Sequence, residues 1–156
     1  MTDSNFIDKV VLLNVKDRKV LMTRSLGKDK FYMPGGKREA GESDIETLVR
    51  ESKEEMDIDI VVDTAQYWDT FIAQAHGKPE GVMVKAVCYT ANFIGEPKAS
   101  NEIEEVGYLG FDRREDVVGV AQTVFDDLKA KNMIDYAYDR NYKTSGRIRA
   151  PRLRRR

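Results

Sequence analysis

The sequence "PGGKREAGESDIETLVRESKEEMDIDI" runs from Pro34 to Ile60. It opens with a Pro-Gly-Gly turn and then holds eight acidic residues between Glu39 and Asp57. Like charges this close in the sequence repel one another, so they weaken a helix unless something compensates them. A dense group of acidic residues directly after a flexible turn therefore predicts a binding site for a positively charged ligand.

A helix is predicted from about Asp44 to Met56, and Ser43 or Asp44 can cap its start. Apolar residues recur at a helical period on one side of this segment, which indicates a face packed on a core. These residues are Ile45, Leu48, Val49 and Met56.

Three carboxylates, Glu51, Glu54 and Glu55, are spaced i, i+3 and i+4 on this helix, so they share one face. Mg²⁺ and Mn²⁺ prefer oxygen ligands, and such a cluster becomes favourable around them. The Gly35-Gly36 turn lets the backbone approach the same place without a side chain in the way. The pattern thus predicts a divalent cation site, and such sites most often handle phosphate groups.

The spacing from Gly36 to Ile58 resembles the Nudix box, the signature of the Nudix hydrolases. Two positions depart from it: Ser52 stands where the family usually has an apolar residue, and Asp57 where it usually has glycine. Asp57 falls at the expected end of the helix, where a left-handed residue is common and Asp is tolerated. Neither departure removes a metal ligand. The matching positions are Gly36, Glu42, Arg50, Glu51, Glu54, Glu55 and Ile58.

The resemblance implies metal ligands and catalytic residues within the box. Glu54 and Glu55 would be the main ligands of Mg²⁺ or Mn²⁺, Glu51 would share in ligation, and the carbonyl of Gly36 would complete the inner shell. Arg50 would hold the helix carboxylates in place.

The resemblance also implies a brace and a further carboxylate. Glu42 would brace the loop against the helix through Arg50. A carboxylate outside the box often serves as base or extra ligand, and "SNEIEEVGYLGFD" offers Glu102, Glu104 and Glu105. We favour Glu102, then Glu105, and a solvated run of charge explains any one of them equally well.

The function implied is Mg²⁺-dependent attack by water on a diphosphate linkage in a nucleoside diphosphate joined to another group. A MutT-type nucleoside triphosphate pyrophosphohydrolase, giving the monophosphate and pyrophosphate, is the leading hypothesis. Ala73 stands where ADP-ribose enzymes tend to have proline, and residues 74–76 lack the tyrosine of the dinucleoside polyphosphate type. The alternatives are a nucleotide sensor that does not hydrolyse, or a hydrolase of sugar nucleotides or RNA ends.

The element order predicts a mixed α/β domain, and the resemblance implies the Nudix α/β/α sandwich with helices packed on a mixed sheet. Val10–Val15 and Val20–Arg24 are predicted to form a hairpin around "KDRK". Strands are expected within Ile58–Ala73 and Gly81–Ile94, and another in "EVGYLGF". A second helix is expected over Val117–Lys131.

The whole chain has 156 residues, which fits one domain over residues 1–146 and a basic tail over 147–156. The tail holds six arginines and no acid, so taking it from the net charge of −1 leaves about −7 on the rest. An acidic body has no general attraction for nucleic acid, which leaves the tail as its only contact. The lone Cys88, the absence of a signal sequence and of a long apolar run predict a cytoplasmic protein off the membrane. A homodimer is left open.

Other residues near the turn are weaker candidates. Lys37 and Arg38 follow the turn and Arg24 ends a strand that points toward it, so each could meet phosphate, and solvent explains each equally well. His76 is interpreted as a turn residue. The aromatic residues Tyr67, Trp68 and Phe71 are interpreted as core rather than as a stacking platform for a base.

Overall fold

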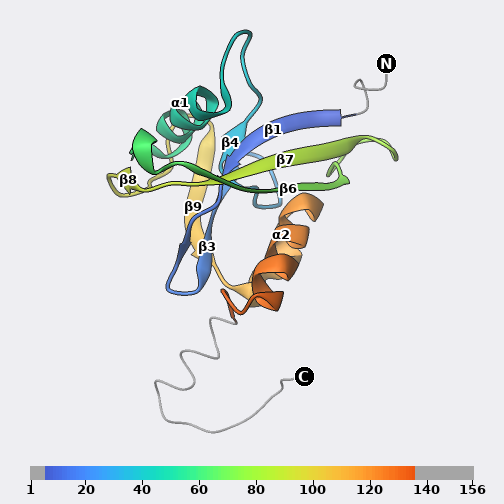
Figure 1. Cartoon of the computed structure of the whole chain (residues 1–156). Coiled ribbons are helices and arrows are strands. Elements are labelled where there is room, and N and C mark those ends of the chain that lie inside the picture. Colours follow the sequence, from blue (N-terminus) through green and yellow to red (C-terminus); the bar gives the residue numbers. More distant parts are fainter. Residues whose placement is uncertain (1–5, 136–156) are drawn as a thin grey trace, which may run out of the picture.

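The computed structural model describes residues 6–135, and the basic tail predicted over 147–156 lies outside them. The central sheet has the order β4 (Gly35–Gly36), β1 (Phe6–Leu12), β7 (Met83–Thr90) and β6 (Gln66–Gln74). Strands β1 and β7 are parallel, whereas β4 and β6 pair antiparallel with their neighbours, so the sheet is mixed (Figure 1). The predicted mixed α/β class is therefore confirmed.

Two smaller sheets complete the strands. One has the order β2 (Val15–Lys16), β3 (Lys19–Ser25) and β9 (Ile103–Leu109), all antiparallel. The other pairs β5 (Asp59–Ile60) with β8 (Phe93–Ile94). The strands predicted within residues 58–73, 81–94 and 105–111 are therefore present.

The predicted hairpin is partly wrong. The turn is there: Asp17 and Arg18 both have positive φ, and β2 pairs with β3 across it. The first half of the run Val10–Val15, however, belongs to β1, which pairs with β7 instead of β3. The chain changes sheets at residues 13 and 14, where the N–H of Leu13 donates to Tyr89 of the central sheet. The apolar run Val10–Leu13 does not show in the sequence which strand it pairs with.

The helix α1 (Asp44–Met56) has the predicted bounds because local signals fix both ends. Ser43 and Glu46 form a reciprocal capping box at its start. At its end Asp57 is left-handed, with φ 56°, as the sequence predicted. Ser52 is buried, so its small side chain lies in the packed face of the helix.

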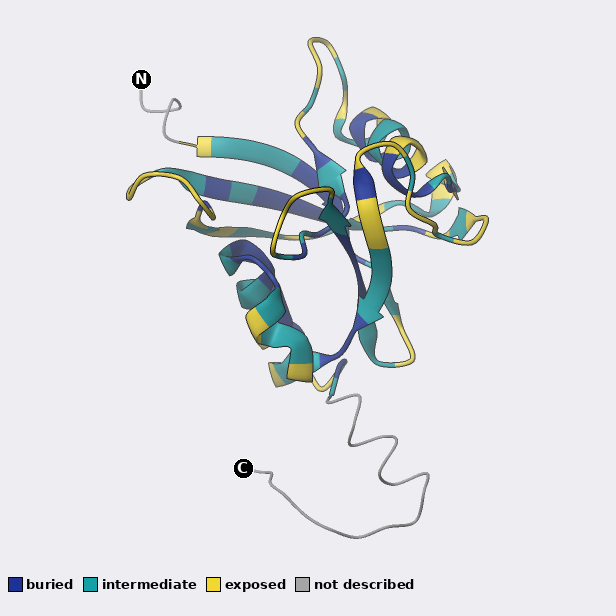
Figure 2. Ribbon diagram, turned by 180° about the vertical axis from the view of Figure 1, so that it is seen from behind, coloured by how far each residue is buried: buried dark blue, intermediate teal, exposed yellow. Residues whose placement is uncertain are grey.

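The two helices cover opposite faces of the central sheet, as Figures 1 and 2 show. Side chains alternate along a strand, so Val10 and Leu12 pack with α1, while Val11 packs with α2 (Gly119–Ala130). This is the predicted α/β/α sandwich. Helix α2 begins two residues later than predicted. The four residues expected to face inward, Val120, Val124, Phe125 and Leu128, are buried, and so is Ala121.

The remaining elements are the short 3-10 helices η2 (Val62–Thr64) and η3 (Phe111–Asp116).

Trp68 and Phe71 pack against the α2-side core, as predicted. The prediction that Tyr67 is also a core residue is wrong, because 57% of Tyr67 is exposed. Within residues 6–135, no helix is long and apolar enough to cross a membrane.

Candidate active site

Helix α1 presents its three predicted carboxylates at different depths. The side chain of Glu54 is 49% exposed and that of Glu51 is 14% exposed, while Glu55 is buried. The i, i+3, i+4 spacing has therefore produced one acidic face that runs from solvent into the protein.

Glu55 is the deepest of these groups. Its Oε1 accepts a hydrogen bond of 3.0 Å from the backbone N–H of Gly35. Burial raises the pKa of Glu55 to about 8, and the negative charges of Glu51 and Glu102 act in the same direction. A cation bound beside Glu55 would favour its charged form, as the N–H of Gly35 and the charge of Lys9 already do in part.

The glycine turn is required by close contacts on both of its residues. Gly35 has φ 144°, and a Cβ there would overlap the backbone of Val10 in the adjacent strand. A Cβ on Gly36 would overlap the carboxylate of Glu51. The backbone of the turn thus reaches the acidic face of α1 because no side chain stands between them.

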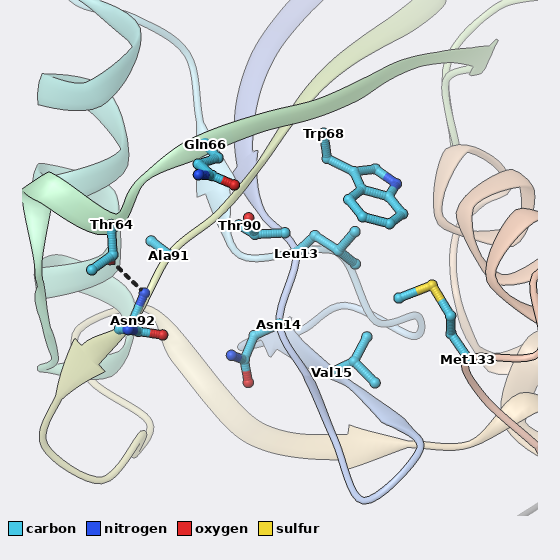
Figure 3. Close-up of a pocket in the computed structure, with 10 residues that line it drawn as sticks. All are labelled: Leu13, Asn14, Val15, Thr64, Gln66, Trp68, Thr90, Ala91, Asn92 and Met133. Carbon is cyan, nitrogen blue, oxygen red and sulfur yellow. Dashed lines mark hydrogen bonds between the residues drawn. The ribbon is translucent and has the colours of Figure 1, made fainter.

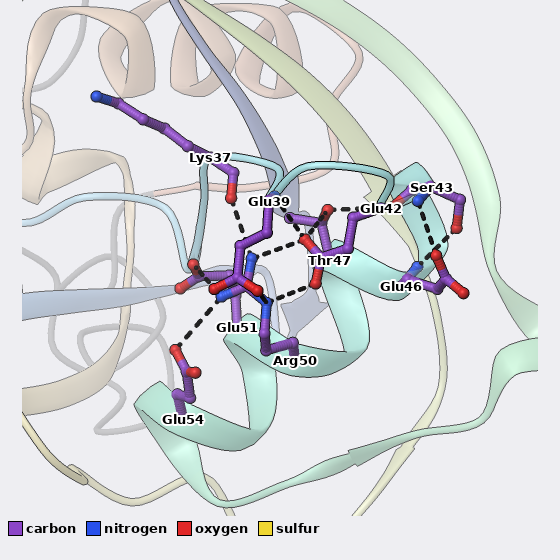
Figure 4. A network of polar contacts seen from close by, with 9 residues as sticks. All are labelled: Lys37, Glu39, Glu42, Ser43, Glu46, Thr47, Arg50, Glu51 and Glu54. Carbon is purple, nitrogen blue, oxygen red and sulfur yellow. Dashed lines mark hydrogen bonds and ion pairs between the residues drawn. The ribbon is translucent and has the colours of Figure 1, made fainter.

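Arg50 organises the exposed part of the acidic face (Figure 4). Its Nε donates to Oε2 of Glu42 at 2.6 Å, and its Nη1 donates to Oε2 of Glu51 at 3.0 Å. Nη1 also lies 3.6 Å from Glu54. The guanidinium holds the pKa of Glu42 down at about 2, helped by the N–H of Glu39. The predicted brace from Glu42 through Arg50 to the helix is present in this form.

The last turn of α1 is capped by a loop that carries Glu102. The N–H of Ser100 donates to the carbonyl of Glu55 at 3.1 Å, and Nδ2 of Asn101 donates to the carbonyl of Glu54 at 2.7 Å. These bonds tie the loop to the helix end, where carbonyl groups lack partners. The pKa of Glu51 is raised mainly by burial, and Glu102 is close enough for its negative charge to add to this rise. Sequence reasoning missed this cap, although Asn at a left-handed position, φ 55°, is a common signal for a turn.

Glu105 and Arg24 lie in a separate ion-pair cluster. Arg24 pairs with Glu104 and with Glu105, at 3.0 Å in each case, and also donates to the carbonyl of Lys28. The structure thus brings Glu102 to the acidic face of α1, while Glu105 and Arg24 contact each other.

Within the described part of the chain, no three metal-ligating side chains are already gathered for an ion. Glu51 turns toward Arg50 instead. The donors nevertheless suit a hard cation, because every side chain involved offers oxygen and the buried Glu55 needs positive charge.

A basic cavity of about 230 Å³ lies beside the glycine turn. It contains no acidic residue, and within it Lys9 is near enough to the acidic face for its charge to interact with Glu55 and Glu51, as well as with Lys37. Its polar and aromatic lining residues are Lys9, Lys28, Tyr32, Lys37, His76 and Lys78. The sequence pointed to Lys37 but gave no sign of Lys9, which lies far from the box in the chain.

Arg38 and His76 are held by other partners. Arg38 donates to Asp44 at 2.6 Å and to Asp8 at 3.0 Å, so it ties the loop to α1 and β1. His76 lies in the turn after β6, as predicted, with Nε2 3.2 Å from Oδ1 of Asp29.

A second cavity, of about 550 Å³, has a different character (Figure 3). No charged residue lines it, and Gln66, Trp68 and Asn92 are among its walls. An uncharged lining does not suit a polyanionic ligand, so the basic cavity is the better candidate for a phosphate-bearing substrate.

The class of protein follows from this arrangement: an acidic helix after a glycine turn, on a mixed sheet between two helices, is the frame of a phosphate hydrolase. The NUDIX domain family matches residues 8–132, and the chain belongs to this family. It is a Nudix pyrophosphohydrolase, an enzyme of the class that acts on diphosphate linkages in nucleoside diphosphate derivatives. A comparison with curated proteins found no match.

Solved structures show the same fold. The MutT protein from Methanosarcina mazei Go1 is 21% identical, with a TM-score of 0.65 over 81% of this chain and 95% of that one. A NUDIX hydrolase from Nitrosomonas europaea is 14% identical, with a TM-score of 0.63 over 85% and 94%. The MutT NUDIX hydrolase from Burkholderia pseudomallei is 22% identical, with a TM-score of 0.59 over 77% and 95%.

Proposed function

We propose that the enzyme is a Mg²⁺-dependent nucleoside triphosphate pyrophosphohydrolase that releases the nucleoside monophosphate and pyrophosphate. The observation that carries this proposal is Glu55, a buried carboxyl near Glu51 and Glu102 whose charge interacts with that of Lys9, a lining residue of the basic cavity. A bound cation would stabilise the charged form of this carboxyl, and a bound anion would offset the positive charges of the nearby lysines. A metal–polyphosphate substrate supplies both.

The metal would be Mg²⁺ or Mn²⁺, held by Glu54 and Glu55 with Glu51, Glu102 and the carbonyl of Gly36. When bound, it would neutralise charge on the phosphates and activate the attacking water. The oxygen-only donor set and the close approach of Gly36 to Glu51 support this choice.

The other residues of the network position these ligands. Arg50 is proposed to orient Glu51 and Glu54, and Glu42 to fix Arg50 in turn. For the carboxylate outside the box we retain Glu102 over Glu105, because the capping loop holds Glu102 beside α1 while Glu105 pairs with Arg24.

The substrate's phosphates are proposed to extend from the acidic face of α1 into the basic cavity. Lys37 lines that cavity and so remains a candidate for a phosphate contact. Arg24 and Arg38 could join only by leaving carboxylate partners, which makes them weaker candidates.

The test is a panel of nucleoside di- and triphosphates and sugar nucleotides with Mg²⁺, followed by identification of the products. The proposal expects triphosphates to be the best substrates, with monophosphate and pyrophosphate as products. Preferred release of a sugar phosphate would identify the enzyme as a sugar-nucleotide hydrolase. Preferred action on RNA 5′ ends would identify it as a hydrolase of RNA ends. Binding without turnover across the whole panel would indicate a sensor.

We further propose that residues 1–146 form the catalytic domain and that the tail 147–156 takes no part in turnover of small nucleotides. A cytoplasmic location and a homodimeric assembly also remain proposals. The buried Cys88, with burial raising the pKa of its thiol to about 12, supports a structural rather than a redox role for that residue.

A further inference from the structure

Lys9 occupies a position where the pattern of its strand calls for an apolar side chain. It lies in β1 between Ile7 and Val11, which share its face of the sheet and pack with the α2-side core. It is paired in register with the small Ala86 of β7. A half-buried lysine among these neighbours loses hydration, so its presence needs a compensating partner.

The part of the chain that the structure describes, residues 6–135, offers Lys9 no hydrogen bond and no ion pair within 4.0 Å. Its Nζ lies instead 5.2 Å from the centre of the Tyr32 ring. Burial lowers the pKa of Lys9, while the negative charges of Glu55 and Glu51 oppose that effect and Lys37 adds to it. The aromatic ring and these distant carboxylates stabilise the positive charge of the ammonium group. They do not accept hydrogen bonds from its three N–H donors.

The surroundings place these donors at the edge of the acidic face. Val10, the next residue in the chain, pairs with Gly36, and Tyr32 stands shortly before the same glycine turn. Lys9, Tyr32 and Lys37 all line the basic cavity. An anion held over the carboxylates by a divalent cation would therefore have Lys9 beside it.

We propose that Lys9 is a substrate-contacting residue that donates hydrogen bonds to a non-bridging phosphate oxygen of the diphosphate being hydrolysed. The inference rests on the proposed function. Lys9 would bind the diphosphate rather than hold the metal. It would also favour substrates that carry a negatively charged phosphate oxygen beside its ammonium group.

The test compares Lys9→Met and Lys9→Gln with Lys85→Met. Lys85 is a matched control because it lies in the neighbouring strand β7 and is adjacent in register to Asp8, on the opposite face of the sheet from Lys9. The probe is methylenediphosphonate with Mg²⁺, whose P–C–P bridge cannot be hydrolysed. Calorimetry would give its affinity, and a separate titration would give the affinity for Mg²⁺ alone.

A lost hydrogen bond to a charged oxygen should weaken diphosphonate binding about tenfold to a hundredfold in both Lys9 variants. Affinity for Mg²⁺ alone should stay equal or become tighter, since a positive charge near Glu55 and Glu51 is gone. A weaker diphosphonate affinity without a weaker Mg²⁺ affinity distinguishes a lost substrate contact from damage to the fold, which would weaken both affinities. The KM for a nucleoside triphosphate should rise by a factor similar to the loss of diphosphonate affinity, with a smaller effect on kcat.

Several outcomes would overturn the inference alone: diphosphonate affinity unchanged in the Lys9 variants, an equal loss in Lys85→Met, or loss of Mg²⁺ affinity in parallel. A loss seen only with ligands that carry a nucleoside would also overturn it, because Lys9 would then contact the base. If the parent protein bound neither Mg²⁺ with diphosphonate nor any nucleotide, the proposed function would fail, and this inference with it.

Discussion

The Nε atom of Arg50 donates a hydrogen bond of 2.6 Å to Oε2 of Glu42, across eight positions of the chain. This bond joins the start of the box to the middle of helix α1. The same guanidinium then reaches Glu51 with its Nη1. The position of Glu51, a proposed metal ligand, is thereby linked through Arg50 to a residue of the loop before the helix.

Replacing Arg50 by Lys tests this link. Lysine keeps the positive charge but cannot form the planar fork that engages Glu42 and Glu51 together. Groups that orient ligands typically change metal affinity by about 10–100-fold when removed, so we expect a loss of that size in Mg²⁺ affinity. Calorimetric titration with Mg²⁺ would measure it, and unchanged affinity would show that Arg50 does not orient the ligands.

Replacing Glu42 by Gln gives a prediction about pH. The pKa of Glu42 is lowered from 4.5 to about 2 in the folded protein, mainly by Arg50, so folding is favoured by the ionised form. This stabilisation is complete above pH 4.5 and disappears as the pH falls through about 2. The variant should therefore melt below the parent at neutral pH, and the difference should shrink as the pH falls between these values. Thermal midpoints across this range would show it, with Glu80→Gln, in an exposed loop, as control. A difference that stayed constant with pH would contradict the assignment.

Replacing Gly36 by Ala should damage the site more than the fold. The added Cβ would overlap the Glu51 carboxylate, so that side chain must move. We expect turnover to fall by at least about tenfold, since loss of alignment in an active site is costly. Gly107→Ala is the matched control, because a Cβ there meets nothing within 4 Å. Equal turnover in the two variants would show that the position of Glu51 is unimportant.

Replacing Asp57 by Gly should be tolerated. Glycine relieves the left-handed strain at φ 56° but gives the unfolded chain more freedom, and the two effects, each about 1 kcal/mol or less, nearly cancel. The variant also loses exposed contacts to Lys53 at 3.1 Å and Lys98 at 3.4 Å, and exposed ion pairs of this kind contribute little to stability. The thermal midpoint should fall slightly and Mg²⁺-dependent turnover should persist. A collapse of Mg²⁺ affinity with an unchanged midpoint would make Asp57 a ligand.

The sequence predicted those parts of the structure that local signals determine. The capping box at Ser43 and the left-handed Asp57 fix helix α1, and its period fixes which carboxylates share a face. The partner of β1 could not be predicted, because Val10–Leu13 is a continuous apolar run and the change of sheet at residues 13 and 14 depends on distant strands. The same holds for Lys9 and for the loop around Asn101, whose importance appears only when separate segments meet.

The proposed function requires that the carboxylates of α1 bind the ion on which hydrolysis depends. The most direct measurement is the rate of nucleoside triphosphate hydrolysis at saturating Mg²⁺ for the parent, Glu54→Gln and Glu55→Gln. Glutamine keeps the size of the side chain but removes the charge, so both variants should fold and lose turnover by orders of magnitude. Glu55→Gln should also melt no lower than the metal-free parent, because it removes a buried acid. Near-parental turnover in either variant would contradict the proposed metal site.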